Sequence, residues 1–143
     1  MLRTADLIDR IIPFNQVDDK DSLILIKSIR EGLNYSFFDS ILKISPFSFD
    51  EWSIYLNLSE RTLQRYKKEK KVFQASFAER ILEISLLYNY GIEVFEDKAN
   101  FDSWLDTKSI GLGGIKPKDL FDTTFGINLV CDELTRIEHG VLA

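Results

Sequence analysis

Cysteine, histidine and proline are scarce in this 143-residue chain, which holds one, one and three of them. Cys131 alone cannot form an internal disulfide, and with His139 as the single histidine the usual zinc ligands cannot be assembled. No stretch approaches the roughly 20 apolar residues that span a bilayer, and Asp6 and Asp9 interrupt the apolar N-terminus, unlike a signal peptide. We therefore expect a protein of a reducing cytoplasm, with no membrane partner, metal or cofactor.

Apolar and aromatic residues, in contrast, are abundant. Hydrophobic types make up 45% of the chain, with eleven Phe, five Tyr and two Trp, enough for a packed interior and too many for a disordered chain. The net charge of −5 argues against a surface that binds polyanions over its whole extent. The side chains of the neighbouring acids Asp132 and Glu133 point in different directions on a helix, which is poor geometry for paired acid–base catalysis. With a single histidine, no catalytic Ser/His/Asp or Cys/His arrangement is persuasive. We predict that the chain is not an enzyme.

The stretches between the few prolines and glycines carry apolar residues at helical rather than alternating spacing. Three Ser-x-x-Asp/Glu patterns, beginning at Ser36, Ser48 and Ser76, are typical of capping boxes, in which the hydroxyl and the carboxylate satisfy free N–H groups of the first helical turn. The sequence predicts an all-α fold of about seven or eight helices, without a sheet of three or more strands.

Two helices are expected before the first of these boxes. Thr4 can cap a short helix that Pro13 ends, and a second helix follows Asp21 and closes near Gly32. The residues at helical spacing on the second helix, and hence its expected inward face, are Leu23, Ile26, Ile29 and Leu33.

Glycine and proline also set the expected helix ends in the C-terminal half. Gly91 should close the long helix from Ser76, and Pro117 suits the first turn of a later helix. A last helix is expected from about Thr124 to His139, before a left-handed cap at Gly140. Its inner face would carry Ile127, Cys131, Leu134 and either Ile137 or Glu138.

The segment from Phe49 to Lys71 has the pattern of a helix-turn-helix. A first helix would end near Asn57, which tolerates the left-handed conformation that such turns require, and Ser59 would cap the second helix. Leu63 and Tyr66 would face inward. The candidate DNA-binding residues are Arg61, Thr62, Gln64, Arg65, Lys67, Lys68 and Lys71.

The two halves of the chain differ in charge. Six basic and two acidic residues lie between Ser59 and Lys71, whereas five basic and ten acidic residues follow from Gly91 to Ala143. Because neutralising phosphates drives duplex binding, the contrast suggests two surfaces with two functions. A solvated helix face in a helical bundle would also account for the basic segment.

Five marks in order characterise the C-terminal third. They are the Val94-Phe95 pair, the Trp104-Leu105 pair, the Leu112-Gly113-Gly114 loop with Pro117 after it, the Thr123-x-x-Gly126 step and the run from Arg136 to Gly140. This third closely resembles the toxin-binding domain of the Xre/MbcA/ParS antitoxin family. Upstream, Ser59-x-Arg61-Thr62-Leu63-x-Arg65 resembles the Xre-type helix-turn-helix of that family, so that the resemblance covers roughly residues 21–143.

The resemblance implies a division of the chain into an N-terminal helix-turn-helix bundle and a small helical toxin-binding domain. Residues 1–20 would be an N-terminal extension, 21–75 the Xre-like helix-turn-helix domain, 76–90 a connecting helix and 91–143 the toxin-binding domain.

The resemblance also implies a function, that of the bacterial, cytoplasmic antitoxin of a RES–Xre type II toxin–antitoxin system. The cognate RES-domain toxin would be similar to ADP-ribosyltransferases and act on NAD, and the antitoxin would cover its NAD cleft with the C-terminal tail. A homodimer would bind operator DNA and repress its own operon. The implied toxin-binding residues are Trp104, Leu105, Gly113, Gly114, Pro117, Arg136, Glu138, His139, Gly140, Val141, Leu142 and Ala143.

From the residues alone, other interpretations stay open. A free-standing helix-turn-helix transcription regulator, with a C-terminal half that only dimerises, has the same features. Trp104 can be a core anchor instead of a binding residue, and C-terminal tails are commonly frayed. A neighbouring reading frame for a RES-type toxin would distinguish the two functions.

Overall fold

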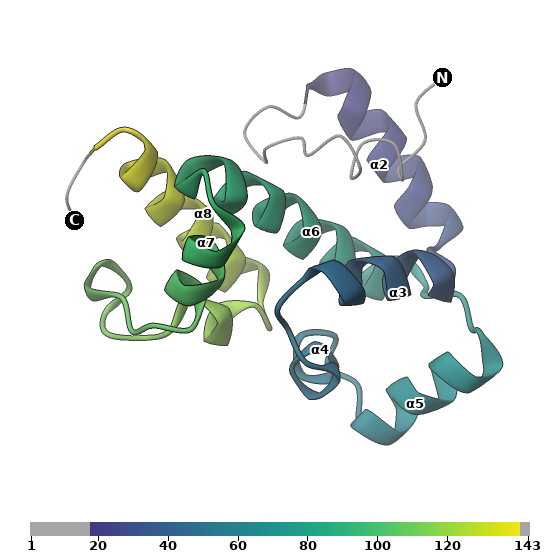
Figure 1. Cartoon of the computed structure of the whole chain (residues 1–143). Coiled ribbons are helices and arrows are strands. Elements are labelled where there is room, and N and C mark those ends of the chain that lie inside the picture. The colour runs from purple at the N-terminus through teal and green to yellow at the C-terminus, as the bar shows by residue number, and fades with distance from the viewer. Residues whose placement is uncertain (1–17, 141–143) are drawn as a thin grey trace.

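The computed structural model describes residues 18–140, and over this range it forms seven α-helices and two 3-10 helices (Figure 1). The elements are α2 (Asp19–Glu31), α3 (Tyr35–Ile44), α4 (Phe49–Tyr55), α5 (Glu60–Glu69), α6 (Ala75–Phe95), α7 (Lys98–Leu105), η2 (Ile110–Leu112), η3 (Pro117–Leu120) and α8 (Thr124–Glu138). The β-type pairing within residues 18–140 amounts to two isolated bridges, Leu33 with Phe73 and Ser109 with Ile115. The predicted all-α fold is confirmed. The helix expected between Thr4 and Pro13 lies outside the described residues.

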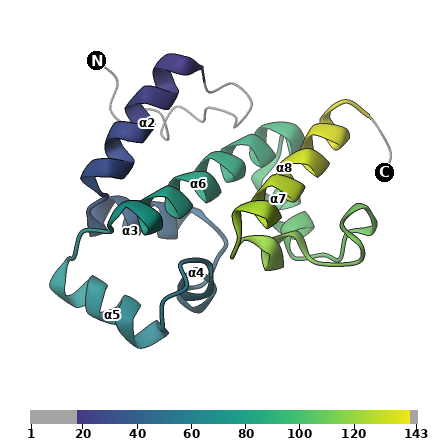
Figure 2. The same cartoon turned by 180° about the vertical axis from the view of Figure 1, so that it is seen from behind.

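The long helix α6 runs through the middle of the molecule. Helices α2 to α5 gather around its N-terminal half, and α7 and α8 pack on its C-terminal half (Figures 1 and 2). From Ile81 to Gly91 nearly every residue of α6 is buried, which is the pattern of a helix covered on all sides. Both halves of the chain therefore share one helix in their core.

Of the three predicted capping boxes, the one at Ser48 is confirmed. The Ser48 hydroxyl accepts from the Glu51 amide at 3.0 Å, and the Glu51 carboxylate accepts from the Ser48 amide at 3.0 Å. The prediction at Ser36 is wrong, because Asn34 caps α3 and its side-chain oxygen accepts from the Phe37 amide. The helix then begins at Tyr35, and Ser36 falls inside the first turn.

The predicted cap at Ser76 is also wrong. Helix α6 begins at Ala75, and Gln74 stands at the cap position without a side-chain hydrogen bond. The preceding Phe73 is held by two backbone hydrogen bonds to Leu33, of 2.7 and 3.0 Å. This long-range pairing sets where the chain enters the helix, and the local sequence does not show it.

Gly91 was expected to close the long helix, and this is wrong. Helix α6 continues to Phe95 and ends at Glu96, which adopts a left-handed conformation. Gly91 is buried inside the helix, and the ring of Phe101 from α7 occupies the space where a β-carbon would be. The glycine is thus required for close packing of two helices, not for a turn.

The expected inward face of α2 is only partly right. Asp18, not Asp21, caps this helix, which ends at Gly32 as expected. Leu23 and Ile26 are exposed, whereas Leu25 is buried and Ile29 packs against the core. The inward face therefore follows Leu25 and Ile29, one helical turn apart, toward α6.

For the last helices, the predicted starts and the glycine cap are confirmed. Pro117 begins η3, although as a 3-10 helix, and Thr123 caps α8 with its hydroxyl accepting from the Gly126 amide at 2.9 Å. Gly140 has a positive φ of 70°. The inner face of α8 buries Ile127, Cys131 and Leu134 as expected. Its expected continuation to Ile137 or Glu138 is wrong, because both residues are exposed at the end of the helix.

Candidate functional site

Helices α4 and α5 form the predicted helix-turn-helix. Asn57 takes the left-handed conformation with φ of 56°, and the Leu58 amide donates to the Ser53 carbonyl across the turn at 3.0 Å. Ser59 caps α5, its hydroxyl accepting from the Thr62 amide. Leu63 is fully buried beneath this helix. The turn is therefore fixed by local hydrogen bonds, and α5 is held by one inward-facing stripe.

The outward side of α5 brings together most of the predicted DNA-binding residues. A shallow hollow on this side is lined by Arg61, Thr62, Gln64, Arg65, Lys68 and Glu69. Thr62 is half-buried and its hydroxyl accepts from Ser59 in the helix cap, and Arg65 lies 3.8 Å from Glu69. The face is basic, solvent-exposed and free of large apolar side chains, as a surface that contacts phosphates would be.

Two of the predicted lysines lie at the sides of this face. The Lys67 ammonium is 6.0 Å from the centre of the Phe49 ring, and that of Lys71 is 5.5 Å from the Tyr66 ring. Cations over aromatic faces are stabilised modestly. Both side chains stay within reach of a polyanion that spans α5, although they do not line the hollow.

Within the C-terminal half, the predicted toxin-binding residues divide into buried and exposed ones. Leu105 and Pro117 are buried, so they can support a binding surface but cannot contact a partner in this structure. Trp104 is half-buried, with its ring centre 5.5 Å from that of Phe95 and 5.9 Å from that of Phe101. These positions make the Trp104-Leu105 pair mainly a packing element of α7.

The loop from Ser109 to Ile115 is closed by its own backbone. The Ser109 amide donates to the Ile115 carbonyl at 3.0 Å, and the Gly114 amide donates to the Ser109 carbonyl at 2.8 Å. Gly113 and Gly114 both have positive φ, of 75° and 80°, and both face open space. Glycine is needed here because other residues rarely adopt this conformation.

The end of α8 carries the remaining predicted toxin-binding residues. Arg136 pairs with Glu133 through two nitrogens, at 2.7 and 3.0 Å. Glu138 accepts a hydrogen bond from the Tyr90 hydroxyl at 3.1 Å, and burial together with that contact raises the pKa of Tyr90. His139 and Gly140 are exposed. The predicted residues Val141, Leu142 and Ala143 lie outside the described residues.

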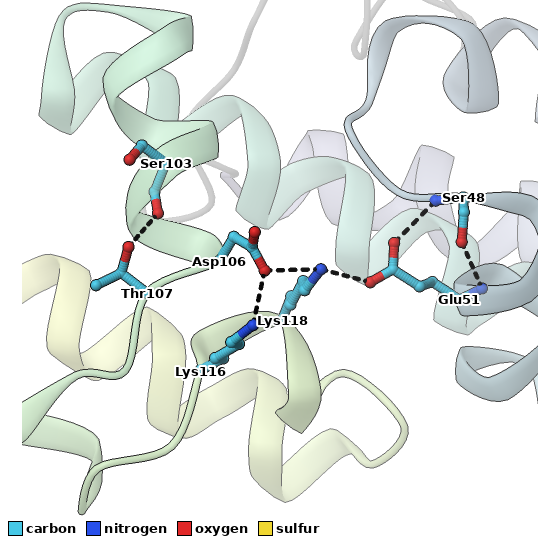
Figure 3. Close-up of polar contacts among 7 residues, drawn as sticks. All are labelled: Ser48, Glu51, Ser103, Asp106, Thr107, Lys116 and Lys118. Atoms are coloured by element: carbon cyan, nitrogen blue, oxygen red, sulfur yellow. Dashed lines mark hydrogen bonds and ion pairs between the residues drawn. The ribbon is translucent and has the colours of Figure 1, made fainter.

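A group of ion pairs joins the two halves, and sequence reasoning did not find it. The Lys118 ammonium from η3 lies 2.8 Å from Glu51 of α4 and 2.9 Å from Asp106 after α7 (Figure 3). These hydrogen bonds raise the pKa of Lys118. Burial opposes the shift at Glu51, but Lys118 and the Ser48 amide together lower its pKa. The residues are far apart in sequence, and no local signal marks them.

Arg80 of α6 makes a second connection between the halves. Its guanidinium donates to the Tyr55 carbonyl at 3.0 Å and to the Phe121 carbonyl at 3.4 Å. The Phe121 ring lies edge-on to those of Phe47 and Tyr55, with ring centres 5.5 and 5.6 Å apart. Polar and aromatic contacts thus hold the C-terminal half directly against the helix-turn-helix.

Three exposed apolar side chains in the C-terminal half were also missed. Ile110, Phe125 and Leu129 all point into solvent. Phe125 and Leu129 lie out of phase with Ile127, Cys131 and Leu134, a signal that the sequence does contain.

Neither a metal site nor a membrane span is found between residues 18 and 140. That part of the chain holds no group of three or more His, Cys, Asp or Glu side chains placed to bind an ion. Its helices are too short or too polar to cross a bilayer.

Two family models match the chain, one on each half. Residues 24–84 match the antitoxin Xre-like helix-turn-helix domain, and residues 91–140 match the antitoxin Xre/MbcA/ParS C-terminal toxin-binding domain. Together these define a two-part antitoxin with a helix-turn-helix and a toxin-binding domain. The chain belongs to the Xre/MbcA/ParS antitoxin family.

Two curated relatives agree with this assignment. An antitoxin Xre from Yersinia enterocolitica is 29% identical over 121 residues, which is 84% of this chain and 82% of the relative. An antitoxin Xre from Photorhabdus laumondii subsp. laumondii is 27% identical over 116 residues, or 80% of this chain and 78% of the relative. Both similarities extend over most of each chain, so each reaches into both matched domains.

Proposed function

We propose that this chain is the non-enzymatic antitoxin of a RES-domain toxin, whose NAD-binding active site it binds and occludes. The observation that carries the proposal is the pairing, in one chain, of a helix-turn-helix with a toxin-binding domain of this family. The RES class of the toxin and the occlusion of its NAD site are the finer parts of the proposal. They rest on the family resemblance and on the position of the end of α8.

The two candidate surfaces lie far apart on the molecule. Helix α5 and the end of α8 are at opposite ends in both views (Figures 1 and 2). A protein bound at α8 would therefore leave the basic face of α5 open to DNA. This arrangement supports a complex that inhibits the toxin and represses its own operon at the same time, with the antitoxin as a homodimer on a two-fold operator.

Occlusion of a cleft needs a projecting element and binding energy, but no chemistry. The segment from Arg136 through Gly140 forms the end of α8 and the residues directly after it. Glu138, which accepts a hydrogen bond from Tyr90, also offers a carboxylate to the arginines with which a nucleotide site binds phosphate. We therefore assign the inhibitory role to residues 136–143.

The test is a titration of NAD consumption by the protein of the adjacent reading frame with two forms of the antitoxin. The intact chain should abolish consumption. A form lacking residues 138–143 should remain helical and still associate, but consumption should return. Asp132→Asn, on the exposed side of α8, serves as the control and should inhibit like the parent. Full inhibition by the truncated form would assign the blockade to the helical body.

A further inference from the structure

The two most exposed large apolar side chains of the described residues, Ile110 and Phe125, lie in the C-terminal half. Ile110 is 92% exposed, Phe125 86% and Leu129 51%. Single exposed apolar residues are common on soluble proteins, but a group of them on one side of a small domain is typical of an interaction site. The core of the domain does not use these side chains.

Phe125 and Leu129 are placed together by the geometry of α8. They are four residues apart, and side chains at this spacing lie one above the other on the same helix face. The buried residues Ile127, Val130 and Leu134 occupy the opposite face. The two apolar side chains therefore form a stripe that α8 turns away from the protein interior.

The loop that carries Ile110 packs on α8 next to this stripe. Glu133, one turn beyond Leu129, lies with its carboxylate against Gly111, in the space that a β-carbon there would occupy. Arg136 pairs with the same carboxylate, and η2 packs on α8. Figure 2 shows the loop next to α8, on the side away from α2 to α5. Ile110 is thus presented by a preorganised backbone, which lowers the entropic cost of binding.

We propose that Ile110, Phe125 and Leu129 form one interaction surface, here called the α8–loop surface. These side chains insert into an apolar hollow on the toxin. The inference rests on the proposed function and separates docking on this surface from blockade by residues 136–143. The surface lies within residues 91–140, the part that matches a toxin-binding domain. It also adjoins Arg136, where the blocking segment begins, so one partner can engage both.

The test replaces the stripe with charge in the full-length chain. Phe125→Asp combined with Leu129→Asp keeps both positions in solvent, so helix formation and operator binding should not change. Affinity for the protein of the adjacent reading frame, measured by calorimetry, should fall by at least about 100-fold, as for the loss of central apolar anchors. Ile110→Asp, outside any α-helix, should lower the affinity as well. Leu23→Asp, an equally apolar and exposed position on α2, is the matched control and should change the affinity by less than about threefold.

The outcomes separate this inference from the function on which it rests. If the parent chain does not bind that protein, the proposed function fails and the inference fails with it. If the parent binds and the double variant binds within about threefold of it, the inference alone is wrong. A double variant that loses self-association but keeps its toxin affinity would show that the surface joins two copies of this chain, and would equally overturn the inference.

Discussion

Gly91 allows the close contact between α6 and α7. The Phe101 ring fills the space that a side chain on Gly91 would need, and the rings of Tyr88 and Phe95 surround it, with centres 5.5 and 5.4 Å away. Close-packed interiors cannot absorb an added methyl without displacing a neighbour. Position 91 is therefore determined by packing, in spite of the lower helix propensity of glycine.

We expect Gly91→Ala to lower the free energy of unfolding by about 1–3 kcal/mol, the usual cost of overpacking. Urea denaturation followed by circular dichroism measures this. Glu93→Ala, exposed on the same helix, should change stability by less than about 0.5 kcal/mol. Equal stability of Gly91→Ala and the parent would mean that Phe101 is not packed against α6 as described.

Cys131 should be an unreactive thiol. It is buried on the inner face of α8, and burial raises its pKa to about 12, so the reactive thiolate is scarce near neutral pH. A thiol reagent at pH 8 should label native protein far more slowly than protein in denaturant, with the rate read by absorbance. Rapid labelling of the native chain would contradict the packing of α8 against α6.

At the scale of elements, helix α5 has the clearest chemical character. Its outward face gathers Arg61, Gln64, Arg65 and Lys68. Contacts to base edges and contacts to phosphates have different experimental signatures, because the former give sequence preference and the latter give dependence on salt.

We expect Arg65→Ala to weaken operator binding by about 1–3 kcal/mol and to relax sequence preference, as for loss of a base contact. Lys68→Ala should instead reduce the slope of log affinity against log salt by about 1. Fluorescence anisotropy with the upstream DNA at several salt concentrations measures both. Lys27→Ala, on the distant helix α2, is the charge-matched control. Slopes that are the same for Lys68→Ala and Lys27→Ala would exclude α5 as the phosphate-binding helix.

Several features governed by local chemistry were predictable from sequence. The Ser48 capping box, the left-handed Asn57 and the Ser59 cap depend on residues within three positions of one another, and all three are confirmed. The wrong caps at Ser36 and Asp21 were local failures, since Asn34 and Asp18 take the cap positions. Two other failures occurred where distant contacts decide. The start of α6 depends on the Leu33–Phe73 bridge, and the role of Gly91 depends on Phe101. Neither partner lies within one helical turn in the sequence.

For the whole molecule, the candidate sites also differ in whether local or distant contacts determine them. Periodicity indicated which side of α5 faces outward, because one short helix and one buried stripe settle it. The group around Lys118 joins residues from three separate elements, and only the folded chain brings them together. Through these ion pairs α4 contacts the C-terminal half directly, so the two matched domains pack against each other.

Removing this connection should destabilise the whole protein. Lys118→Met keeps the aliphatic stem, and loss of the pair with Glu51 should lower the free energy of unfolding at pH 7 by about 1 kcal/mol, since the pair is only partly shielded from water. Because the fold lowers the pKa of Glu51 and Asp106, their contribution is complete above the unfolded values and is lost as the pH falls through the folded ones.

Urea denaturation between pH 7 and pH 3 tests this connection. The parent should lose more stability on acidification than Lys118→Met, which no longer has the ion pairs to lose. Lys43→Met, which removes a 2.9 Å pair with Asp39 within one helix, is the control. Parallel pH profiles for the parent and Lys118→Met would contradict the connection.

We propose that this chain neutralises a toxin by binding alone. The most direct measurement is the rate of NAD consumption by the purified protein of the adjacent reading frame, with increasing amounts of the full-length chain. We predict a linear fall to zero at a fixed molar ratio, unchanged by longer preincubation, because a non-catalytic blocker acts by stoichiometry. NAD consumption that persists at a large excess of the chain, or that falls with substoichiometric amounts over time, would contradict neutralisation by binding alone.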